Sequence, residues 1–247
     1  MDISDTWPKL TSPPELASGE IHVCRIRVPE VNNLPDNWHT VLTREERERA
    51  NRKRLPIDSR RTLSSRACLR LLLGFYLNLA PNQVKLTTIA AGKPILDHFT
   101  LFPKVEFNVS HSGDWILIGF TRDQPLGIDI EQYRELEFVD LAEQVFTPSE
   151  RAQWEALESA QRARDFFRAW TRKEAYLKAI GLGLIKPLNS FSVTTGENGC
   201  IDLHHSHNNP ISGNWNILDL LPAPEYIGAI ATKVIPDRIK SYTFDYS

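Results

Sequence analysis

The chain has 247 residues, a formal net charge of −2, and 41% hydrophobic residues. This length suffices for one large domain or for two of about 120 residues each. The near-neutral charge argues against general nucleic-acid binding, and no apolar run reaches the ~18 residues that a membrane-spanning helix needs. The three cysteines, Cys24, Cys68 and Cys200, are far apart, and the N-terminus lacks the pattern of a signal peptide. We therefore expect a reduced, cytoplasmic protein.

The first half of the chain is expected to run from a loose lead-in into alternating helices and strands. Alternating apolar and polar residues indicate half-buried strands, and apolar residues at helical intervals indicate helices. Thr43 and Glu46 have the spacing of a capping box, which opens a basic helix that Pro56 interrupts. The expected elements are a lead-in over residues 1–20, a strand at 21–28, helices at 43–53 and 58–79, and strands at 84–89, 95–96, 107–109 and 115–121.

The second half repeats the style of the first. The expected elements are a strand at 126–131, helices at 139–145, from 147 onward and at 163–180, and strands at 190–194, 200–203, 215–220, 226–231 and 241–244. Helices followed by strands, twice over, predict an α+β chain of two similar α/β subdomains. We place the subdomains at residues 21–124 and 125–247.

Three acidic residues and a lysine in the second half are candidates for chemistry. Asp129 and Glu131 lie two residues apart on the expected strand, so their side chains share one face. Glu174 and Lys178 lie one turn apart on the expected long helix. A hard divalent cation and a phosphate-bearing substrate would require such a set. Each pair alone has a plainer interpretation: solvent-facing acids on a half-exposed strand, or a helix ion pair worth about 0.3–0.5 kcal/mol.

Four segments in order resemble the 4'-phosphopantetheinyl transferases, specifically their longer, monomeric, Sfp-like branch. The segments are Gly92-Lys93-Pro94, Phe107-Asn108-Val109-Ser110-His111-Ser112, Gly127-Ile128-Asp129-Ile130-Glu131 and Trp170-Thr171-Arg172-Lys173-Glu174-Ala175-Tyr176-Leu177-Lys178. The resemblance covers roughly residues 40–195, and the order of the segments carries it more than the residue types do. It implies two subdomains related by a pseudo-twofold axis, with coenzyme A in the cleft between them.

The resemblance also implies a reaction. The 4'-phosphopantetheine arm of coenzyme A would move to a serine of an acyl or peptidyl carrier protein, releasing 3',5'-adenosine diphosphate. Such transfer depends mainly on positioning and on charge neutralisation. Mg²⁺, or Mn²⁺ in its place, would be held by Asp129, Glu131 and Glu174. Glu174 would also be the base, directly or through a metal-held water, and Lys178 would offset charge on the pyrophosphate. The implied catalytic residues are Glu174, Lys178 and Asp129.

The same resemblance implies the coenzyme A contacts. His111, with Ser110, would contact the 3'-phosphate, and Arg49 stands where a phosphate-binding lysine is usual. Glu46 stands where a second lysine often sits, which leaves open whether Arg47 supplies the missing positive charge. The implied coenzyme A-binding residues are Arg49, Arg61, Thr62, Lys93, Pro94, Ser110, His111 and Lys178.

Some features of the sequence are also compatible with other functions. The arginine-rich run from Arg44 to Arg61 could be a nucleic-acid patch, but interleaved glutamates disfavour that interpretation. The same arginines could help an acidic carrier protein to dock. Two alternatives remain: a non-catalytic module that binds coenzyme A or a carrier, and a Mg²⁺-dependent hydrolase that releases the arm to water. We expect a monomer with no membrane or nucleic-acid partner.

Overall fold

The computed structural model describes most of the chain. Gly92 of the first motif and residues 1–5 and 11–13 of the lead-in lie outside the described residues. Among the residues described, no helix has the length and apolar character needed to cross a membrane. The described ranges are residues 6–10, 14–30, 35, 37–88, 93–97, 104–122, 124–135, 138–181, 186–195, 201–205 and 215–246.

The first half places one long helix against an antiparallel sheet. Its elements are β1 (Glu20–Arg27), α1 (Trp38–Val41), α2 (Arg44–Asn51), α3 (Pro56–Leu77), the 3-10 turn η2 (Pro81–Gln83), β2 (Leu86–Thr88), β3 (Pro94–Leu96), β4 (Val105–Ser112) and β5 (Trp115–Arg122). Pro56 opens α3 instead of merely ending the preceding helix, because the first turn needs no N–H from it. Helix α3 buries Cys68, Leu69 and Leu72 in one core with residues of β1, β4 and β5.

The second half repeats this arrangement. Its elements are β6 (Leu126–Gln132), α4 (Phe138–Val145), α5 (Pro148–Glu155), α6 (Ser159–Ala179), the 3-10 turn η4 (Leu188–Ser190), β7 (Phe191–Thr195), β8 (Ile201–His205), β9 (Asn216–Leu220) and β10 (Tyr226–Thr232). The strand order β6-β10-β9 matches β1-β5-β4 of the first half, and each half adds a separate two-stranded sheet. The predicted α+β fold of two similar halves is confirmed.

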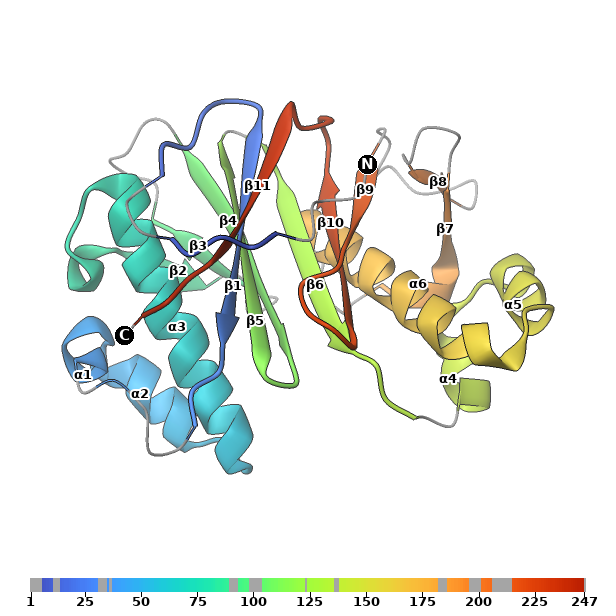
Figure 1. The fold of residues 1–247 in the computed structure, drawn as a ribbon, viewed down its shortest axis with the longest axis horizontal. Coiled ribbons are helices and arrows are strands. Elements are labelled where there is room, and N and C mark those ends of the chain that lie inside the picture. Colours follow the sequence, from blue (N-terminus) through green and yellow to red (C-terminus); the bar gives the residue numbers. More distant parts are fainter. Residues whose placement is uncertain are drawn as a thin grey trace.

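An apolar layer holds the two halves together. Ile21, Val23 and Leu117 of the first sheet pack in one buried cluster with Ile128 and Ile130 of β6. Strand β4, at the edge of the first sheet, contacts β6, at the edge of the second. The helices of the first half lie on one side of the central strands, and those of the second half lie on the other (Figure 1).

The last strand leaves the second half and joins the first. The sequence predicts a strand at residues 241–244; β11 (Arg238–Thr243) starts earlier and pairs in parallel with β1. The chain end lies beside α1 (Figure 1), where the rings of Tyr246 and Trp38 are 5.3 Å apart. The C-terminal segment therefore straps the two halves together.

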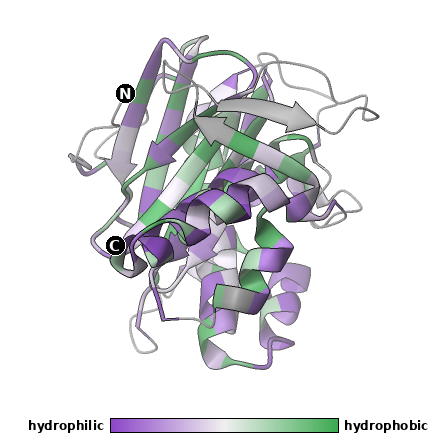
Figure 2. Cartoon of the chain, turned by 90° about the vertical axis from the view of Figure 1, so that its right-hand side faces the viewer, coloured by the Kyte–Doolittle hydropathy of each residue, from purple (hydrophilic) through white to green (hydrophobic). Residues whose placement is uncertain are grey.

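Hydropathy follows this layering. In Figure 2, hydrophobic and hydrophilic residues intermingle along the strands, and the helices in front of them carry the two kinds on different faces. Helix α6 shows the pattern most clearly: Phe166, Phe167 and Leu177 are buried, whereas Gln161 is exposed. An amphipathic helix of this kind takes most of its stability from the face it packs.

Candidate functional site

Side-chain hydrogen bonds join β4 to β6 where the two halves meet. Ile128 donates its backbone N–H to Asn108 Oδ1 at 2.9 Å. Ser110 donates to Asp129 Oδ1 at 2.7 Å, and Ser112 donates to Glu131 Oε2 at 2.8 Å. The residues that take part alternate along β4, because every second side chain of a strand points the same way. Asp129 and Glu131 therefore share the face that meets β4, as the sequence predicts.

Helix α6 rests directly on β6, and Gly127 makes this approach possible. A methyl group at Gly127 would collide with the Ala175 carbonyl oxygen and the Ala179 nitrogen. The glycine of the Gly-Ile-Asp-Ile-Glu segment is thus needed for packing. The contact brings Glu174 and Lys178, from two successive turns of α6, over Asp129.

Lys178 and Asp129 form a largely enclosed ion pair. Lys178 Nζ lies 2.6 Å from Asp129 Oδ1, 2.9 Å from Ser110 Oγ and 3.2 Å from the Ile128 carbonyl oxygen. Asp129 is only 4% exposed, and its Oδ2 atom has no hydrogen-bond partner among the described residues. A buried carboxylate oxygen without a partner is costly, so Asp129 keeps an unused position for a ligand.

Glu174 is the second acid with an unused oxygen. It is 8% exposed, and its buried Oε1 atom has no hydrogen-bond partner among the described residues. Burial raises the pKa of Glu174 from 4.5 to about 7; the negative charges of Asp129 and Glu131 add to the rise, and Lys178 opposes it. A carboxyl group with a pKa near neutrality can exchange protons readily at physiological pH.

The three predicted metal ligands are neighbours, but they do not form a preassembled cluster. No group of three or more histidine, cysteine, aspartate or glutamate side chains arranged to hold a metal occurs among the described residues. Glu131 Oε2 accepts from Ser112 and from Arg134, at 2.8 and 3.0 Å. The open oxygens of Asp129 and Glu174 are nevertheless hard donors of the kind Mg²⁺ accepts.

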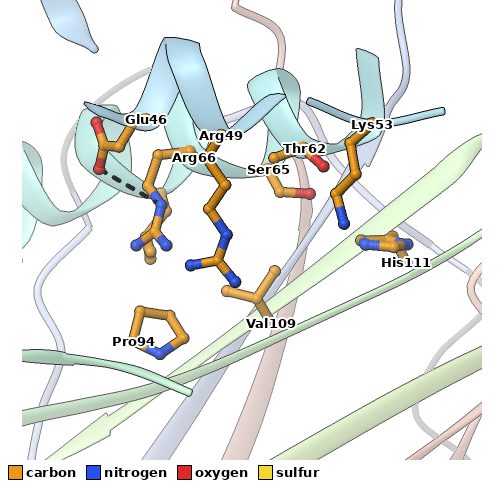
Figure 3. Close-up of a pocket in the computed structure, with 10 residues that line it drawn as sticks. Glu46, Arg49, Lys53, Thr62, Ser65, Arg66, Pro94, Val109 and His111 are labelled. Atoms are coloured by element: carbon orange, nitrogen blue, oxygen red, sulfur yellow. Dashed lines mark ion pairs between the residues drawn. The ribbon is translucent and has the colours of Figure 1, made fainter. Parts of the chain in front are cut away.

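A cavity of about 230 Å³ lies between α2, α3, β3 and β4. Arg49 and Arg66 reach into it with their guanidinium groups, and the ammonium group of Lys53 lies near the ring of His111 (Figure 3). Its lining residues are Glu46, Arg49, Lys53, Thr62, Ser65, Arg66, Leu69, Pro94, Val109 and His111. Three cationic side chains and a histidine against one acid make this cavity suited to an anion such as a phosphate.

His111 connects the cavity to the acidic site. Its ring is exposed to the cavity, yet the surrounding protein lowers its pKa, and the positive charges of Lys178 and Arg61 lower it further. The neutral ring can still donate one hydrogen bond to a phosphate oxygen. The side chain of Ser110, one residue earlier, lies on the opposite side of β4, where it contacts Asp129. Ser110 and His111 therefore do not face the same phosphate.

Of the predicted coenzyme A contacts, Arg49, Thr62, Pro94 and His111 line the cavity. Arg61 is not among the lining residues: it donates to the Gly113 carbonyl at 2.8 Å and pairs with Asp58. Lys93 and Lys178 are not among them either. Lys93 donates to the carbonyl oxygens of Leu126 and Lys178 at 3.3 and 3.0 Å, which ties the first half to the end of α6.

Glu46 and Arg47 have structural partners. Glu46 completes the capping box of α2 with Thr43 and pairs with Arg70 Nε at 2.9 Å and with Arg66 Nε at 3.4 Å. Arg47 donates to the carbonyl oxygens of His39 and Leu42, at the end of α1. Arg47 is therefore turned away from the cavity, and it is Arg66 that supplies the extra positive charge there.

The sequence reasoning missed Lys53, Ser65 and Arg66 as lining residues. A usable signal existed for the last two, because Thr62, Ser65, Arg66 and Leu69 follow the i, i+3, i+4, i+7 spacing of one helix face. Burial lowers the pKa of Arg66, and the neighbouring Arg49 and Arg70 act in the same direction while Glu46 opposes them. Ser65 Oγ is buried and has no hydrogen-bond partner among the described residues.

Comparisons with known proteins agree with this geometry. A model of the 4'-phosphopantetheinyl transferase superfamily matches residues 125–231, and a model of the N-terminal part of a 4'-phosphopantetheinyl transferase matches residues 33–121. The transferase HetI of a Nostoc species is 33% identical over 232 residues, which span 93% of this chain and 94% of the relative.

Two Bacillus proteins are similar over shorter stretches. The transferase psf-1 of Bacillus pumilus is 33% identical over 76% of this chain and 78% of its own length. The transferase Sfp of Bacillus subtilis is 30% identical over 70% of this chain and 75% of its own length. With its paired halves, buried acids and cationic cavity, the chain belongs to the 4'-phosphopantetheinyl transferases.

Proposed function

We propose that this transferase moves the 4'-phosphopantetheine arm of coenzyme A to a serine of acyl or peptidyl carrier domains in a Mg²⁺-dependent reaction that releases 3',5'-adenosine diphosphate. The observation that carries the proposal is a pair of buried carboxylate oxygens, of Asp129 and Glu174, that have no hydrogen-bond partner in the described part of the chain and lie beside the ammonium group of Lys178. The positive charge of Lys178 also acts on His111, which lines the cationic cavity.

Asp129 and Glu174 would hold the cation through these open oxygens, and Glu131 would be the third protein ligand. When bound, Mg²⁺ supplies positive charge that neutralises the pyrophosphate oxygens as the leaving group departs. Ser110 keeps the Asp129 carboxylate oriented through Oδ1, which leaves Oδ2 for the ion. Mn²⁺ is a plausible substitute, because oxygen ligands accept both ions.

Glu174 would accept the proton of the carrier serine, because it is a buried carboxylate with an open oxygen beside Asp129 and Lys178. The serine oxygen bonds to the phosphorus that carries the pantetheine arm. The bond between that phosphorus and the pyrophosphate bridging oxygen breaks. Lys178 would donate to the departing pyrophosphate oxygens, which replaces part of its interaction with Asp129.

The cationic cavity would hold the 3'-phosphate of coenzyme A. Arg49, Lys53 and Arg66 supply charge, and Thr62 and His111 supply further polar contacts. The Ser65 hydroxyl, which has no partner within the described ranges, is a further donor for the same phosphate. We assign Lys93 to the adjoining adenine side of the cleft, because its ammonium group bridges the two halves there.

The partner is a carrier domain, and the protein acts as a monomer in the cytoplasm. Exposed arginines of α2, such as Arg44, suit an acidic carrier surface. Both acyl and peptidyl carrier domains present a serine that the site could reach. No nucleic acid or membrane takes part in the proposed reaction.

Intact-mass analysis tests this proposal. An apo acyl carrier protein and an apo peptidyl carrier domain are each incubated with the transferase, coenzyme A and Mg²⁺, with EDTA as a control. We expect each carrier to gain one phosphopantetheine arm, and the gain to disappear with EDTA. Unmodified carrier with free phosphopantetheine in solution would instead indicate hydrolysis, and full activity in EDTA would refute the requirement for a divalent cation.

Two variants separate the roles of the residues. Asp129→Ala should abolish transfer while the protein stays folded, because a metal ligand is lost. His111→Ala should weaken the use of coenzyme A more than that of 3'-dephospho-coenzyme A. An equal loss for both substrates would remove His111 from the 3'-phosphate site.

A further inference from the structure

The ammonium group of Lys173, the residue before Glu174, is fully enclosed by oxygen atoms on the side of α6 away from the acidic site. We call these contacts the Lys173 bracket. Its side chain is 0% exposed. Its ammonium nitrogen lies 2.6 Å from Glu150 Oε2, 2.7 Å from the Val145 carbonyl oxygen, 2.8 Å from that of Phe191 and 3.0 Å from that of Leu188. These oxygens belong to the end of α4, the start of α5, η4 and the start of β7. One side chain of α6 therefore fixes four neighbouring elements.

Glu150 extends this bracket. Its Oε2 atom accepts from the Thr147 N–H at 2.8 Å, which completes the capping box of α5. Its Oε1 atom accepts from the Val193 N–H of β7 at 2.8 Å. Every oxygen of this carboxylate is used, so the Glu150–Lys173 pair is a satisfied buried network. Such networks define one geometry of the surrounding elements more than they add stability.

The first half contains an equivalent set of contacts around Arg70, the Arg70 bracket. Glu46 completes the capping box of α2 and pairs with Arg70 of α3. Arg70 is 4% exposed and donates to the carbonyl oxygens of Pro81 and Val84 at 3.2 and 2.8 Å. In both halves, a capping-box glutamate binds a buried cation of the long helix, which in turn binds carbonyl oxygens of the segment after that helix.

The contacts of Lys173 affect the positions of Glu174 and Lys178, because all three residues belong to α6. Successive residues of a helix point about 100° apart, so Lys173 faces α5 and β7 while Glu174 faces β6. A slide of α6 by one residue, or a rotation about its axis, would move Glu174 and Lys178 away from Asp129. The opposite side of α6 is held by its close contact with Gly127. Helix α6 is thus fixed from both sides.

We propose that Lys173, held by Glu150, is a positioning residue for the transfer reaction: it sets the rotation and register of α6 so that Glu174 and Lys178 meet Asp129. It touches neither coenzyme A nor the carrier. The proposal rests on the proposed function, which assigns Glu174 and Lys178 to the chemistry. In a purely stabilising role, Lys173 would affect the melting temperature but not the turnover of folded enzyme.

The test compares matched variants of the full-length protein. Lys173→Met removes the cation and keeps an unbranched side chain that is only one atom shorter. Glu150→Gln removes the charge and converts one of the two accepting oxygens into an amide NH2 group, which cannot accept from Lys173, Thr147 or Val193. Arg70→Met removes the equivalent cation of the first half and serves as the control. We measure the melting temperature of each variant, and then kcat and the KM for coenzyme A at a temperature where circular dichroism shows every variant to be folded.

Lys173→Met should lower kcat by about 100-fold, the usual effect of displacing a catalytic group by ~1 Å, with the KM for coenzyme A changed by less than about threefold. Arg70→Met should lower the melting temperature too, with the opposite kinetic result: a raised KM and a kcat within about threefold of wild type. Lys173→Arg should recover part of kcat, because the first half uses arginine in the same bracket.

Glu150→Gln should fold and lose kcat several-fold, and it decides the matter if Lys173→Met does not fold. The proposal is overturned if folded Lys173→Met, or Glu150→Gln in its place, keeps the kcat of wild type. It is also overturned if Arg70→Met and Lys173→Met lose kcat equally. If wild type itself modifies no carrier, the proposed function fails and the proposal fails with it; if wild type transfers the arm, only the role of Lys173 is being judged.

Discussion

Ser110 of β4 donates a hydrogen bond to Asp129 of β6 at 2.7 Å, and the same hydroxyl accepts from Lys178 of α6 at 2.9 Å. One side chain of the first half therefore holds both members of an ion pair that belongs to the second. Ser110 is only 7% exposed, so these bonds are shielded from competing water. The acidic site depends on contact between the halves as much as on its own acids.

Ser110→Ala should lower kcat by about tenfold, because Asp129 and Lys178 each lose one partner and their carboxylate and ammonium groups become less well oriented. The KM for coenzyme A should change little, since Ser110 does not line the cationic cavity. Steady-state kinetics with an apo carrier domain checks this. Ser112→Ala, which removes the analogous bond to Glu131, is the matched comparison. A normal kcat in Ser110→Ala would exclude an orienting role for the hydroxyl.

Glu174→Gln should stabilise the metal-free protein at high pH. The pKa of Glu174 is about 7 in the folded protein against 4.5 ordinarily, so ionisation is harder in the folded state than in the unfolded state. The resulting destabilisation is absent below about pH 4.5, grows as pH rises, and is complete above about pH 7. Glutamine removes it, and the free energy of unfolding should rise by about 1–3 kcal/mol at alkaline pH.

Urea unfolding in EDTA across this pH range measures the effect. Exposed Glu135 offers the control, because Glu135→Gln removes an acid at the surface of the protein. An advantage of Glu174→Gln that is equal at low and high pH would show that ionisation of Glu174 is not its cause.

Local patterns were sufficient to predict most elements and the acidic site. Alternation over residues 126–131 predicts that Asp129 and Glu131 share a face, and β6 places them so. The one-turn spacing of Glu174 and Lys178 predicts that they act together. The same alternation rule also separates Ser110 from His111, a consequence that the motif-based interpretation did not use.

Features that depend on long-range packing could not be predicted in this way. Nothing in residues 238–243 indicates that β11 pairs with β1 of the other half, because that pairing depends on the position of the whole chain. Glu46 illustrates the same limit. A family pattern predicts a phosphate-binding lysine at this position. In this chain, Glu46 instead pairs with Arg70, which lies 24 residues further along the sequence.

Glu46→Lys should therefore harm the protein instead of improving its anion site. The substitution adds a positive charge beside the cavity, but it leaves Arg70 buried without its carboxylate and removes half of the capping box. Breaking a buried pair costs about 3–5 kcal/mol, so the melting temperature should fall markedly. Arg47→Ala is the control, because Arg47 donates to carbonyl oxygens near α1 and does not pair with Arg70 or line the cavity. A stable Glu46→Lys protein with a lower KM for coenzyme A would contradict this account.

Gly127→Ala tests the contact that brings α6 over β6. The added methyl group would collide with backbone atoms of Ala175 and Ala179, and backbone cannot move aside as a side chain can. Helix α6 must therefore shift away from β6 and carry Glu174 and Lys178 with it. We expect kcat to fall by about 100-fold together with a lower melting temperature.

Gly119→Ala in β5 is the matched control for this shift. It adds the same methyl group, at 3.0 Å from a methyl carbon of Leu126, and a flexible side-chain end can yield by a few tenths of an ångström. This variant should lose some stability and keep most of its kcat. Equal losses of kcat in the two variants would mean that added volume in the core, and not displacement of α6, accounts for the effect. A fall in kcat confined to Gly127→Ala would attribute it to the position of Glu174 and Lys178 over Asp129.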